Sequence, residues 1–377
     1  MISKKDVLAA IALAAISLAS RADPQYTVTD IGTPSVSGAA SQGFGISSSG
    51  NFAYGRSLAG SAGPAWVWSS ESGRIDWTMP SPQKYGPASG AGLGGVNNFG
   101  LAVSSLGTSI GGGTVLPEMW SASTSTVTPL SLLSGYTTGR AADINDSGKA
   151  VGYQGSGTTQ KAVMWDTGTN TVSVITTLTA DGAYMTTPMS INNAGQVLGL
   201  GRASDGTTVV PLLYDSLGGT MAQLDLSGAG SGGVSVYNLS ENGMVTGSVG
   251  STAFLWSASG GARAIPTLAG NASTMTGYAV NSSGWVVGRQ GSSSFLFDGT
   301  TTYDLSTLIA GSGWSVTSSS ASTFGIADNG SIVATGISGS NIHALVLTAV
   351  PEPSSWALMV IGMAVVGTVA RRRPAKE

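Results

Sequence analysis

The sequence predicts an all-β protein, a seven-bladed β-propeller, and three observations support this prediction. A short turn pattern returns seven times with a period of about 47 residues, each copy is followed by short strand-like runs, and the segment before the first copy resembles a strand that the last copy lacks. Composition agrees, because 56 glycines and only 9% charged residues in 377 are typical of short strands joined by tight turns.

The repeated pattern is an aliphatic residue, a cluster of polar turn residues and a closing glycine. The closing glycines are Gly50, Gly100, Gly148, Gly195, Gly243, Gly284 and Gly330. Successive copies are therefore 50, 48, 47, 48, 41 and 46 residues apart, which is the signature of a repeat fold. A glycine after Asn, Asp or Ser supplies the positive φ that a tight hairpin needs, so each unit begins with a hairpin.

Short strands follow each turn. The first is an alternating or β-branched run, such as residues 149–153 or 285–288. The second ends in a bulky residue, and these residues are Trp68, Trp120, Trp165, Tyr214, Trp256, Phe297 and Leu347. A third is visible in most units, for example at residues 172–175. Three or four short strands in 40 to 50 residues predict one propeller blade per repeat.

The last unit is incomplete in a way that predicts how the ring closes. After its second strand the chain runs directly into Pro351, so the third strand is missing. Residues 26–31, before the first repeat, resemble residues 303–308, which hold a third strand. We therefore expect the propeller to span residues 24–349, with an N-terminal strand joining the last blade.

The N-terminus has the three parts of a secretory signal peptide. Lys4 and Lys5 precede an apolar run over residues 7–19, and small residues follow up to Ala22. This order predicts a signal peptide over residues 1–22, removed after Ala22. The alternative is a buried N-terminal helix, which the following Asp23–Pro24 would not continue comfortably.

The C-terminal tail, residues 350–377, contains a short apolar segment between two polar motifs. Pro351, Glu352 and Pro353 lead into residues 356–370, and Arg371, Arg372 and Arg373 follow. As a helix this segment would be about 22 Å long, against about 30 Å for a bilayer core. Arginines after a membrane helix stay cytoplasmic. The sequence thus predicts an intermediate anchored by its tail in the inner membrane, with the body outside.

This tail resembles the PEP-CTERM sorting signal of Gram-negative bacteria. The resemblance rests on the Pro-Glu-Pro of residues 351–353, the apolar segment and the terminal arginines, in that order. It implies recognition by an exosortase, cleavage near the Pro-Glu-Pro, and delivery to the outer surface or extracellular matrix. The alternative is a tail anchor that is never cleaved.

The repeats resemble the extracellular HAF repeat family, named for a His-Ala-Phe start to the second strand. The match is to the pattern, because this sequence keeps His343–Leu345 once and Ala253–Trp256 once. The resemblance covers about residues 26–349 and implies a secreted β-propeller. It implies little about activity.

Composition and motifs exclude several classes of function. The chain has no cysteine, so disulfides, thiolate metal sites and cysteine nucleophiles are absent. Residues 24–350 hold nine Lys and Arg against fifteen Asp and Glu, which disfavours nucleic acid as a partner. The turn asparagines Asn97, Asn145, Asn192 and Asn281 suit side-chain-to-backbone turn bonds, and no D-x-D-x-D-G calcium loop occurs. We predict no metal and no cofactor.

Catalysis has few candidate residues. His343, the only histidine, occupies a position that other repeats fill with Pro64, Lys161 or Ser293, so a Ser-His-Asp site is disfavoured. A carboxylate pair for glycoside hydrolysis stays open. Four acidic residues lie in or beside the turns, and no spacing singles out two of them: Asp143, Asp146, Glu241 and Asp328.

The tryptophans give the candidate binding residues. One bulky residue per repeat at one position suits packing between blades, whereas Trp66, Trp77, Trp285 and Trp314 fall outside that column and would suit glycan contacts if exposed. The sequence thus favours an exported, non-enzymatic propeller that binds envelope or biofilm polysaccharide. The alternatives are a propeller glycan hydrolase or lyase, and a purely structural surface protein with contacts through sheet edges.

Overall fold

A computed structural model describes residues 23–33, 40–58, 65–77, 95–107, 114–316 and 324–350. The predicted signal peptide and sorting tail, with Pro351, Glu352, Pro353 and the three terminal arginines, lie outside these residues. The chain divides into two units, residues 28–348 and the two ends, residues 1–27 with 349–377. In the described part of the ends, the Val350 N–H donates to the Gln25 carbonyl oxygen (2.8 Å).

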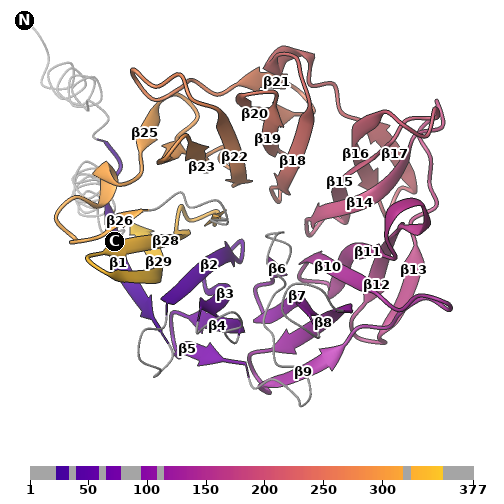
Figure 1. Ribbon diagram of the computed structural model, residues 1–377, viewed down its shortest axis with the longest axis horizontal. Helices are drawn as coiled ribbons and strands as arrows, with labels where there is room; N and C mark the ends of the chain where they lie inside the picture. Colours follow the sequence, from indigo (N-terminus) through magenta and orange to yellow (C-terminus); the bar gives the residue numbers. More distant parts are fainter. Residues whose placement is uncertain are drawn as a thin grey trace, which may run out of the picture. The chain divides into compact units, whose positions relative to one another are not determined.

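Residues 28–348 form the predicted propeller, whose blades succeed one another around a central axis (Figure 1). Six blades are four-stranded sheets in which neighbouring strands in the sequence pair in antiparallel fashion. In each, the first strand lies nearest the axis and the fourth lies at the rim (Figure 1). Tight turns with a closing glycine of positive φ join the first strand to the second, as at Gly148 (φ 70°).

The strands of the first six blades have the following bounds. Blades 1 to 3 are β2(Ala40–Ile46), β3(Phe52–Leu58), β4(Ala65–Ser69), β5(Gly73–Asp76); β6(Gly95–Val96), β7(Leu101–Gly107), β8(Val115–Ser121), β9(Thr126–Pro129); and β10(Gly139–Ile144), β11(Lys149–Gln154), β12(Lys161–Asp166), β13(Thr171–Val174). Blades 4 to 6 are β14(Tyr184–Ile191), β15(Gln196–Arg202), β16(Val209–Asp215), β17(Thr220–Gln223); β18(Val234–Leu239), β19(Val245–Val249), β20(Thr252–Ser257), β21(Gly261–Ala264); and β22(Met275–Val280), β23(Val286–Gln290), β24(Ser293–Phe297), β25(Thr302–Asp304). Within the described residues, three short 3₁₀ turns lie between strands, η1(Gly157–Thr159), η2(Ser227–Ala229) and η3(Thr307–Ile309).

The seventh blade confirms the predicted closure of the ring. Its strand order is β1-β29-β28-β26, and β27 also pairs with β28. The strands are β1(Tyr26–Gly32), β26(Ser315–Val316), β27(Gly325–Ile326), β28(Ile332–Ser338) and β29(Asn341–Ala349). The N-terminal strand thus supplies the outer strand that the last repeat lacks, and the inner strand consists of two short pieces.

Side chains of β1 fix it to the last blade. Ile31 is buried in one cluster with Val333, Val346 and Trp66. Both carboxylate oxygens of Asp30 lie 2.9 Å from Nδ1 of His343 on β29. The single histidine therefore contributes to ring closure.

The core lies between neighbouring blades, as the bulky column predicted. Trp120, Trp165, Phe297 and Leu347 are fully buried. The remaining members are half-buried and pack against clusters between blades: Trp68, Tyr214 and Trp256. Because every blade has a neighbour on each side, both faces of its sheet are covered.

The turn asparagines join each blade to the next. Oδ1 of Asn145 accepts the N–H groups of Ser147 (3.1 Å) and Lys149 (3.0 Å), and Nδ2 donates to the carbonyl oxygen of Asn192 (3.0 Å) in the next blade. The same bond to the next blade is made by Asn97, Asn192 and Asn281 (3.1 Å each). These residues thus close their own turns, as the sequence predicted, and also tie the ring together.

Candidate functional site: an aromatic arc on the inner strands

The inner strands share a β-bulge at one equivalent position. In five blades the pairing of the inner strand with its neighbour skips one residue, and the skipped residues are Phe44, Ala142, Met189, Tyr237 and Tyr278. Each stands three residues before the first polar residue of its turn. A bulge bends the strand and changes the direction of a side chain, and such bulges often lie beside functional sites.

Large aromatic residues occupy this position in four consecutive blades. The ring centroids of Tyr237 and Tyr278 are 5.1 Å apart, and those of Tyr278 and Phe324 are 6.1 Å apart. Phe324 stands at the same place before the turn of blade 7, and Phe44 continues the series in blade 1. We call Tyr237, Tyr278, Phe324 and Phe44 the aromatic arc. Tyr237, Tyr278 and Phe44 lie on the inner strands of blades 5, 6 and 1, next to the axis (Figure 1), and Phe324 directly precedes β27, an inner strand of blade 7.

Cationic side chains accompany the arc. The guanidinium carbon of Arg56 lies 5.5 Å from the centroid of the Phe44 ring, and its Nε donates to Oε1 of Gln42 (3.1 Å). Burial raises the pKa of the Tyr278 hydroxyl, and the positive charge of Arg289 partly offsets this effect. The phenol of Tyr278 is therefore a protonated hydrogen-bond donor at neutral pH. Tyr237, Tyr278 and Phe44 are half-buried, which leaves part of each ring accessible, whereas Phe324 is only 3% exposed and packs beside the ring of Tyr278.

One of the predicted acidic residues, Asp143, is fixed on the inner strand of blade 3. Its Oδ2 accepts the hydroxyl of Ser190 (2.8 Å) and the N–H of Ile191 (3.0 Å) from blade 4, and Oδ1 accepts the N–H of Ile144 (2.8 Å). A Cβ atom on Gly95 of blade 2 would lie 2.0 Å from Oδ1. Burial raises the pKa of Asp143 to about 6, against the opposing effect of these hydrogen bonds.

The other three acidic residues lie in turns and bond to the preceding blade. Asp146 accepts the N–H of Asn98, Glu241 accepts that of Asn193 and Asp328 accepts that of Ser282, each at 2.8 Å. Burial raises the pKa of Glu241, and the negative charges of Asp146 and Asp328 raise it further, so the three carboxylates converge.

Within the described residues, no group of three or more His, Cys, Asp or Glu is arranged to hold a metal ion. The carboxylates of the turns instead serve as acceptors for backbone N–H groups that would otherwise lack partners.

For two of the four tryptophans predicted as ligand contacts, the structure corrects the prediction. Trp66 is 0% and Trp77 is 3% exposed, so neither can stack on a ligand from solvent. Trp66 packs in the cluster with Ile31, and Trp77 stacks on Trp120 with ring centroids 5.2 Å apart. Both are buried because blades cover each other's faces.

The other two tryptophans keep partial exposure but lie outside the arc. Trp285 directly follows the closing glycine of its turn, and its N–H donates to Oδ1 of Asn281 (3.0 Å). The ring centroid of Trp314 lies 5.3 Å from that of His343. The arc was not predicted from the sequence, although Phe or Tyr three residues before the turn in four repeats is a visible signal.

The buried carboxyl of Asp143 predicts a specific pH dependence of stability. Its pKa is about 6 in the folded protein against the ordinary 3.8, so its contribution is fully present below pH 3.8 and is lost as the pH rises through 6. The loss is at most about 3 kcal/mol, at 1.36 kcal/mol per pKa unit. D143N has no titrating group at this position. We therefore expect its free energy of unfolding to fall less between pH 4.5 and 8 than that of the original protein.

Urea unfolding at the two pH values measures this effect. The amide of D143N presents an N–H₂ group to one of the two backbone N–H donors, so the variant should also be less stable at pH 4.5, by about 1–3 kcal/mol. The exposed Glu71 supplies the control, and E71Q should leave both the stability and its slope unchanged. An identical slope in D143N and the original protein would contradict the prediction.

Comparison with known proteins identifies the tail and the fold. Residues 349–373 match the PEP-CTERM protein-sorting motif, which confirms the prediction for the tail and marks an exported protein. None of the curated proteins matches the chain. Among the described residues, no helix has the length and apolar character needed to cross a membrane. The predicted helix over residues 356–370 lies outside them.

Solved structures with the same fold are distant in sequence. An oligogalacturonate lyase from Vibrio parahaemolyticus is 11% identical, with a TM-score of 0.55 over 88% of this chain and 95% of that one. YCF48 bound to D1 peptide is 9% identical, with a TM-score of 0.50 over 87% and 96%. The β-propeller domain of Cps50 (Swd1) from Myceliophteria thermophila is also 9% identical, with a TM-score of 0.50 over 84% and 98%. These likenesses show the fold alone.

Proposed function

We propose that this exported propeller binds polysaccharide of the cell envelope or biofilm matrix through the aromatic arc, without chemically altering it. The observation that carries the proposal is that half-buried aromatic rings, Tyr237, Tyr278 and Phe44, stand at the bulge position of three inner strands around the axis. Aromatic rings stack against the apolar faces of sugars, and their polar groups bond to sugar hydroxyls. Tyr237 and Tyr278 offer both functions, with adjoining rings 5.1 Å apart.

The arrangement suits an extended ligand better than a compact one. Tyr237, Tyr278 and Phe44 belong to blades 5, 6 and 1, so an extended sugar chain can contact more than one of these half-buried rings. Arg56 and Arg289 add hydrogen-bond donors beside Phe44 and Tyr278. A polymer would gain from several such contacts at once, each of them weak.

The sorting motif gives the proposal its cellular setting. The motif implies an exosortase as a general kind of processing partner. We propose that residues 1–22 direct export and that the helix over residues 356–370 holds an inner-membrane intermediate. Cleavage near Pro351–Pro353 would then release the propeller to the outer surface or matrix of a Gram-negative bacterium. We also propose that the repeats are of the HAF type.

A glycan hydrolase or lyase is the second candidate, and Asp143 is the observation that favours it. A carboxyl with a pKa of about 6 is suited to proton transfer near neutral pH. Against this role, both of its oxygens accept hydrogen bonds from Ser190, Ile191 and Ile144. The third candidate, a purely structural surface protein, would leave the arc without a ligand.

One experiment separates these three candidates. The ectodomain, residues 23–350, is mixed with polysaccharide extracted from the producing organism, and both co-sedimentation and the release of new sugar ends are followed. Retention without new ends is the expected result. New ends would identify an enzyme, and the absence of both signals would favour the structural candidate.

Substitutions in the arc test where the polysaccharide binds. We expect Y237A and Y278A each to weaken retention about ten-fold, because one stacking contact is worth about 1 kcal/mol and neighbouring sugar units add to it. Y278F keeps the ring and should retain most binding. The control is L217A, at a side chain that is 84% exposed and lies in the turn before β17. Unchanged retention in the Y237A/Y278A double variant would contradict the assignment.

A further inference from the structure

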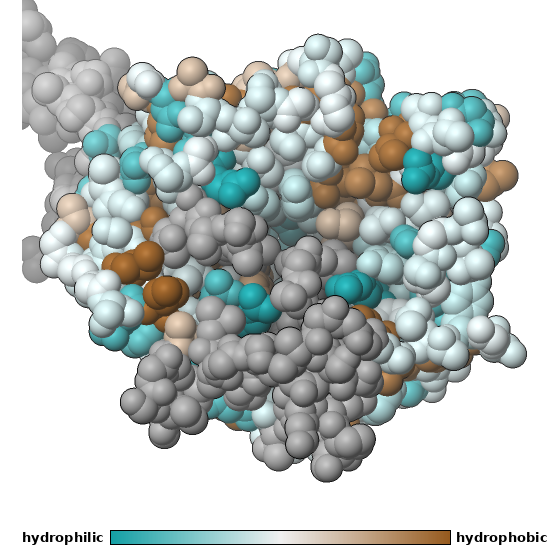
Figure 2. All heavy atoms as spheres, viewed as in Figure 1, coloured by the Kyte–Doolittle hydropathy of each residue, from teal (hydrophilic) through white to brown (hydrophobic). Residues whose placement is uncertain are grey.

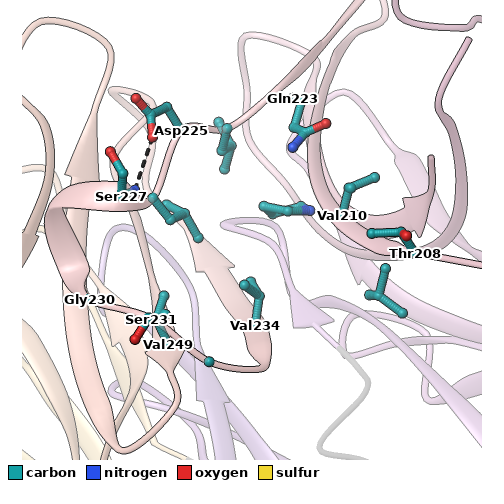
Figure 3. Close-up of a pocket in the computed structure, with 14 residues that line it drawn as sticks. Thr208, Val210, Gln223, Asp225, Ser227, Gly230, Ser231, Val234 and Val249 are labelled. Carbon is teal, nitrogen blue, oxygen red and sulfur yellow. Dashed lines mark hydrogen bonds between the residues drawn. The ribbon is translucent and has the colours of Figure 1, made fainter. Parts of the chain in front are cut away.

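A cavity separate from the aromatic arc opens between blades 4 and 5. Its volume is about 550 Å³. Its aliphatic lining consists of Val209, Val210, Pro211, Leu224, Leu226, Val234 and Val249. Thr208, Val210 and Gln223 lie on one side and Asp225, Ser227 and Val249 on the other (Figure 3). Apolar atoms reach the surface over this junction (Figure 2), where Val209 is 46% exposed.

Two other blade junctions contain a buried glutamine that is absent from the junction between blades 4 and 5. The first is the junction before blade 3. Gln154 stands six residues after Gly148, is 0% exposed, and fills the connection that leads into blade 3. Its Oε1 accepts the N–H of Leu133 (2.7 Å), and its Nε2 donates to the carbonyl oxygen of Ser131 (3.0 Å).

The junction before blade 6 repeats this arrangement. Gln290 stands six residues after Gly284 and is also 0% exposed. Its Oε1 accepts the N–H of Leu268, and its Nε2 donates to the carbonyl oxygen of Asn271, both at 2.8 Å. At each of these two junctions a buried glutamine therefore fastens the connecting segment.

Blade 5 carries a valine where these blades carry glutamine. Val249 stands six residues after Gly243, and its shorter apolar side chain lines the cavity. The connection beside it, residues 227–233, is Ser-Gly-Ala-Gly-Ser-Gly-Gly, and no glutamine amide fastens it. The space that the glutamine amide fills at those two junctions is open here.

Asp225 is the one charged residue among those that line the cavity. Oδ1 of Asp225 accepts the N–H of Ser227 (2.9 Å), and this interaction lowers the pKa of Asp225, so the carboxylate is ionised at neutral pH. The fourteen lining residues include no Lys, Arg or aromatic residue. Anionic ligands would be repelled, and sugars would find no ring to stack on.

We propose that this cavity binds a short peptide segment in which a branched aliphatic residue neighbours a lysine or arginine. The aliphatic walls take the branched side chain, and the exposed, ionised carboxylate of Asp225 pairs with the cation at the rim. The exposed amide of Gln223 can bond to the peptide backbone. A cavity of about 550 Å³ is within the usual range of about 300–1,000 Å³ for small-ligand sites, large enough for one or two side chains.

Calorimetric titration of the ectodomain with two blocked dipeptides tests the proposal. The probes are acetyl-leucyl-lysine amide and acetyl-leucyl-glutamate amide. The lysine peptide should bind saturably in the millimolar range or tighter, and the glutamate peptide at least ten-fold more weakly. Absence of saturable binding by the lysine peptide, or equal binding of both, would overturn the proposal.

Two variants connect that binding to the cavity. V249Q introduces the amide found at the junctions before blades 3 and 6 and should weaken peptide binding at least ten-fold. V249T keeps the branched shape of valine and adds only one hydroxyl, so its affinity should stay within about three-fold. D225N keeps the acceptor for the Ser227 N–H and should weaken binding about five-fold through loss of charge. Wild-type affinity in V249Q, or in D225N if V249Q fails to fold, would overturn the proposal. Retention of polysaccharide should be unchanged in V249Q, V249T and D225N.

Discussion

Replacement of Gly288 by alanine is expected to lower the free energy of unfolding by about 3 kcal/mol, the upper end of typical overpacking costs. A Cβ atom at this position would lie 2.1 Å from the carbonyl oxygen of Thr276 and 2.8 Å from two carbons of the Phe295 ring. The carbonyl belongs to the inner strand, next to the bulge at Tyr278, and cannot withdraw without disturbing the pairing of β22 with β23. Urea unfolding measures the loss.

The same close approach recurs wherever an inner strand carries the bulge. Cβ atoms at Gly55, Gly152 and Gly247 would lie 1.9–2.0 Å from carbonyl oxygens of their inner strands, and the distance in blade 4, at Gly199, would be 2.6 Å. Gly233 gives the control, since a Cβ there meets nothing within 4 Å, and G233A should change stability by less than about 0.5 kcal/mol. Equal unfolding midpoints for G288A and G233A would show that the bulge does not depend on the glycine.

The repeat pattern predicted the fold because each turn carries its own local signal. A closing glycine of positive φ after a cluster of polar turn residues marks the first hairpin of every blade, and no long-range information is needed to find it. Closure was predictable for a similar reason, since a missing outer strand at one end and a spare strand at the other can be matched by sequence.

The sites were harder to predict, because exposure in a propeller does not follow alternation along a strand. Neighbouring blades cover both faces of each sheet, so Trp66 on β4 is buried although it lies outside the bulky column. The arc depends on a bulge in the pairing of two strands, which sequence alone does not give. The cavity at Val249 becomes visible only after the structure assigns a role to Gln154 and Gln290.

Ring closure carries the second large effect, because β1 is the only strand of the described sheets that comes from the other end of the chain. A chain that begins at residue 40 loses β1, including the buried Ile31 and the contact of Asp30 with His343. It also leaves β29 as an unpaired edge. We expect its free energy of unfolding to fall by more than about 3 kcal/mol, the typical cost of deleting one large buried aliphatic side chain alone.

Adding β1 back as a separate peptide tests whether the loss of stability comes from this strand. A synthetic peptide of residues 23–33, added to the chain that begins at residue 40, should restore the urea midpoint toward that of the chain that begins at residue 23. The same peptide with Ile31 replaced by alanine should restore less, because Ile31 packs against Val333 and Val346. If the shortened chain unfolds at the original midpoint without any peptide, the ring does not depend on β1, and blades 7 and 1 must hold together through their own packing.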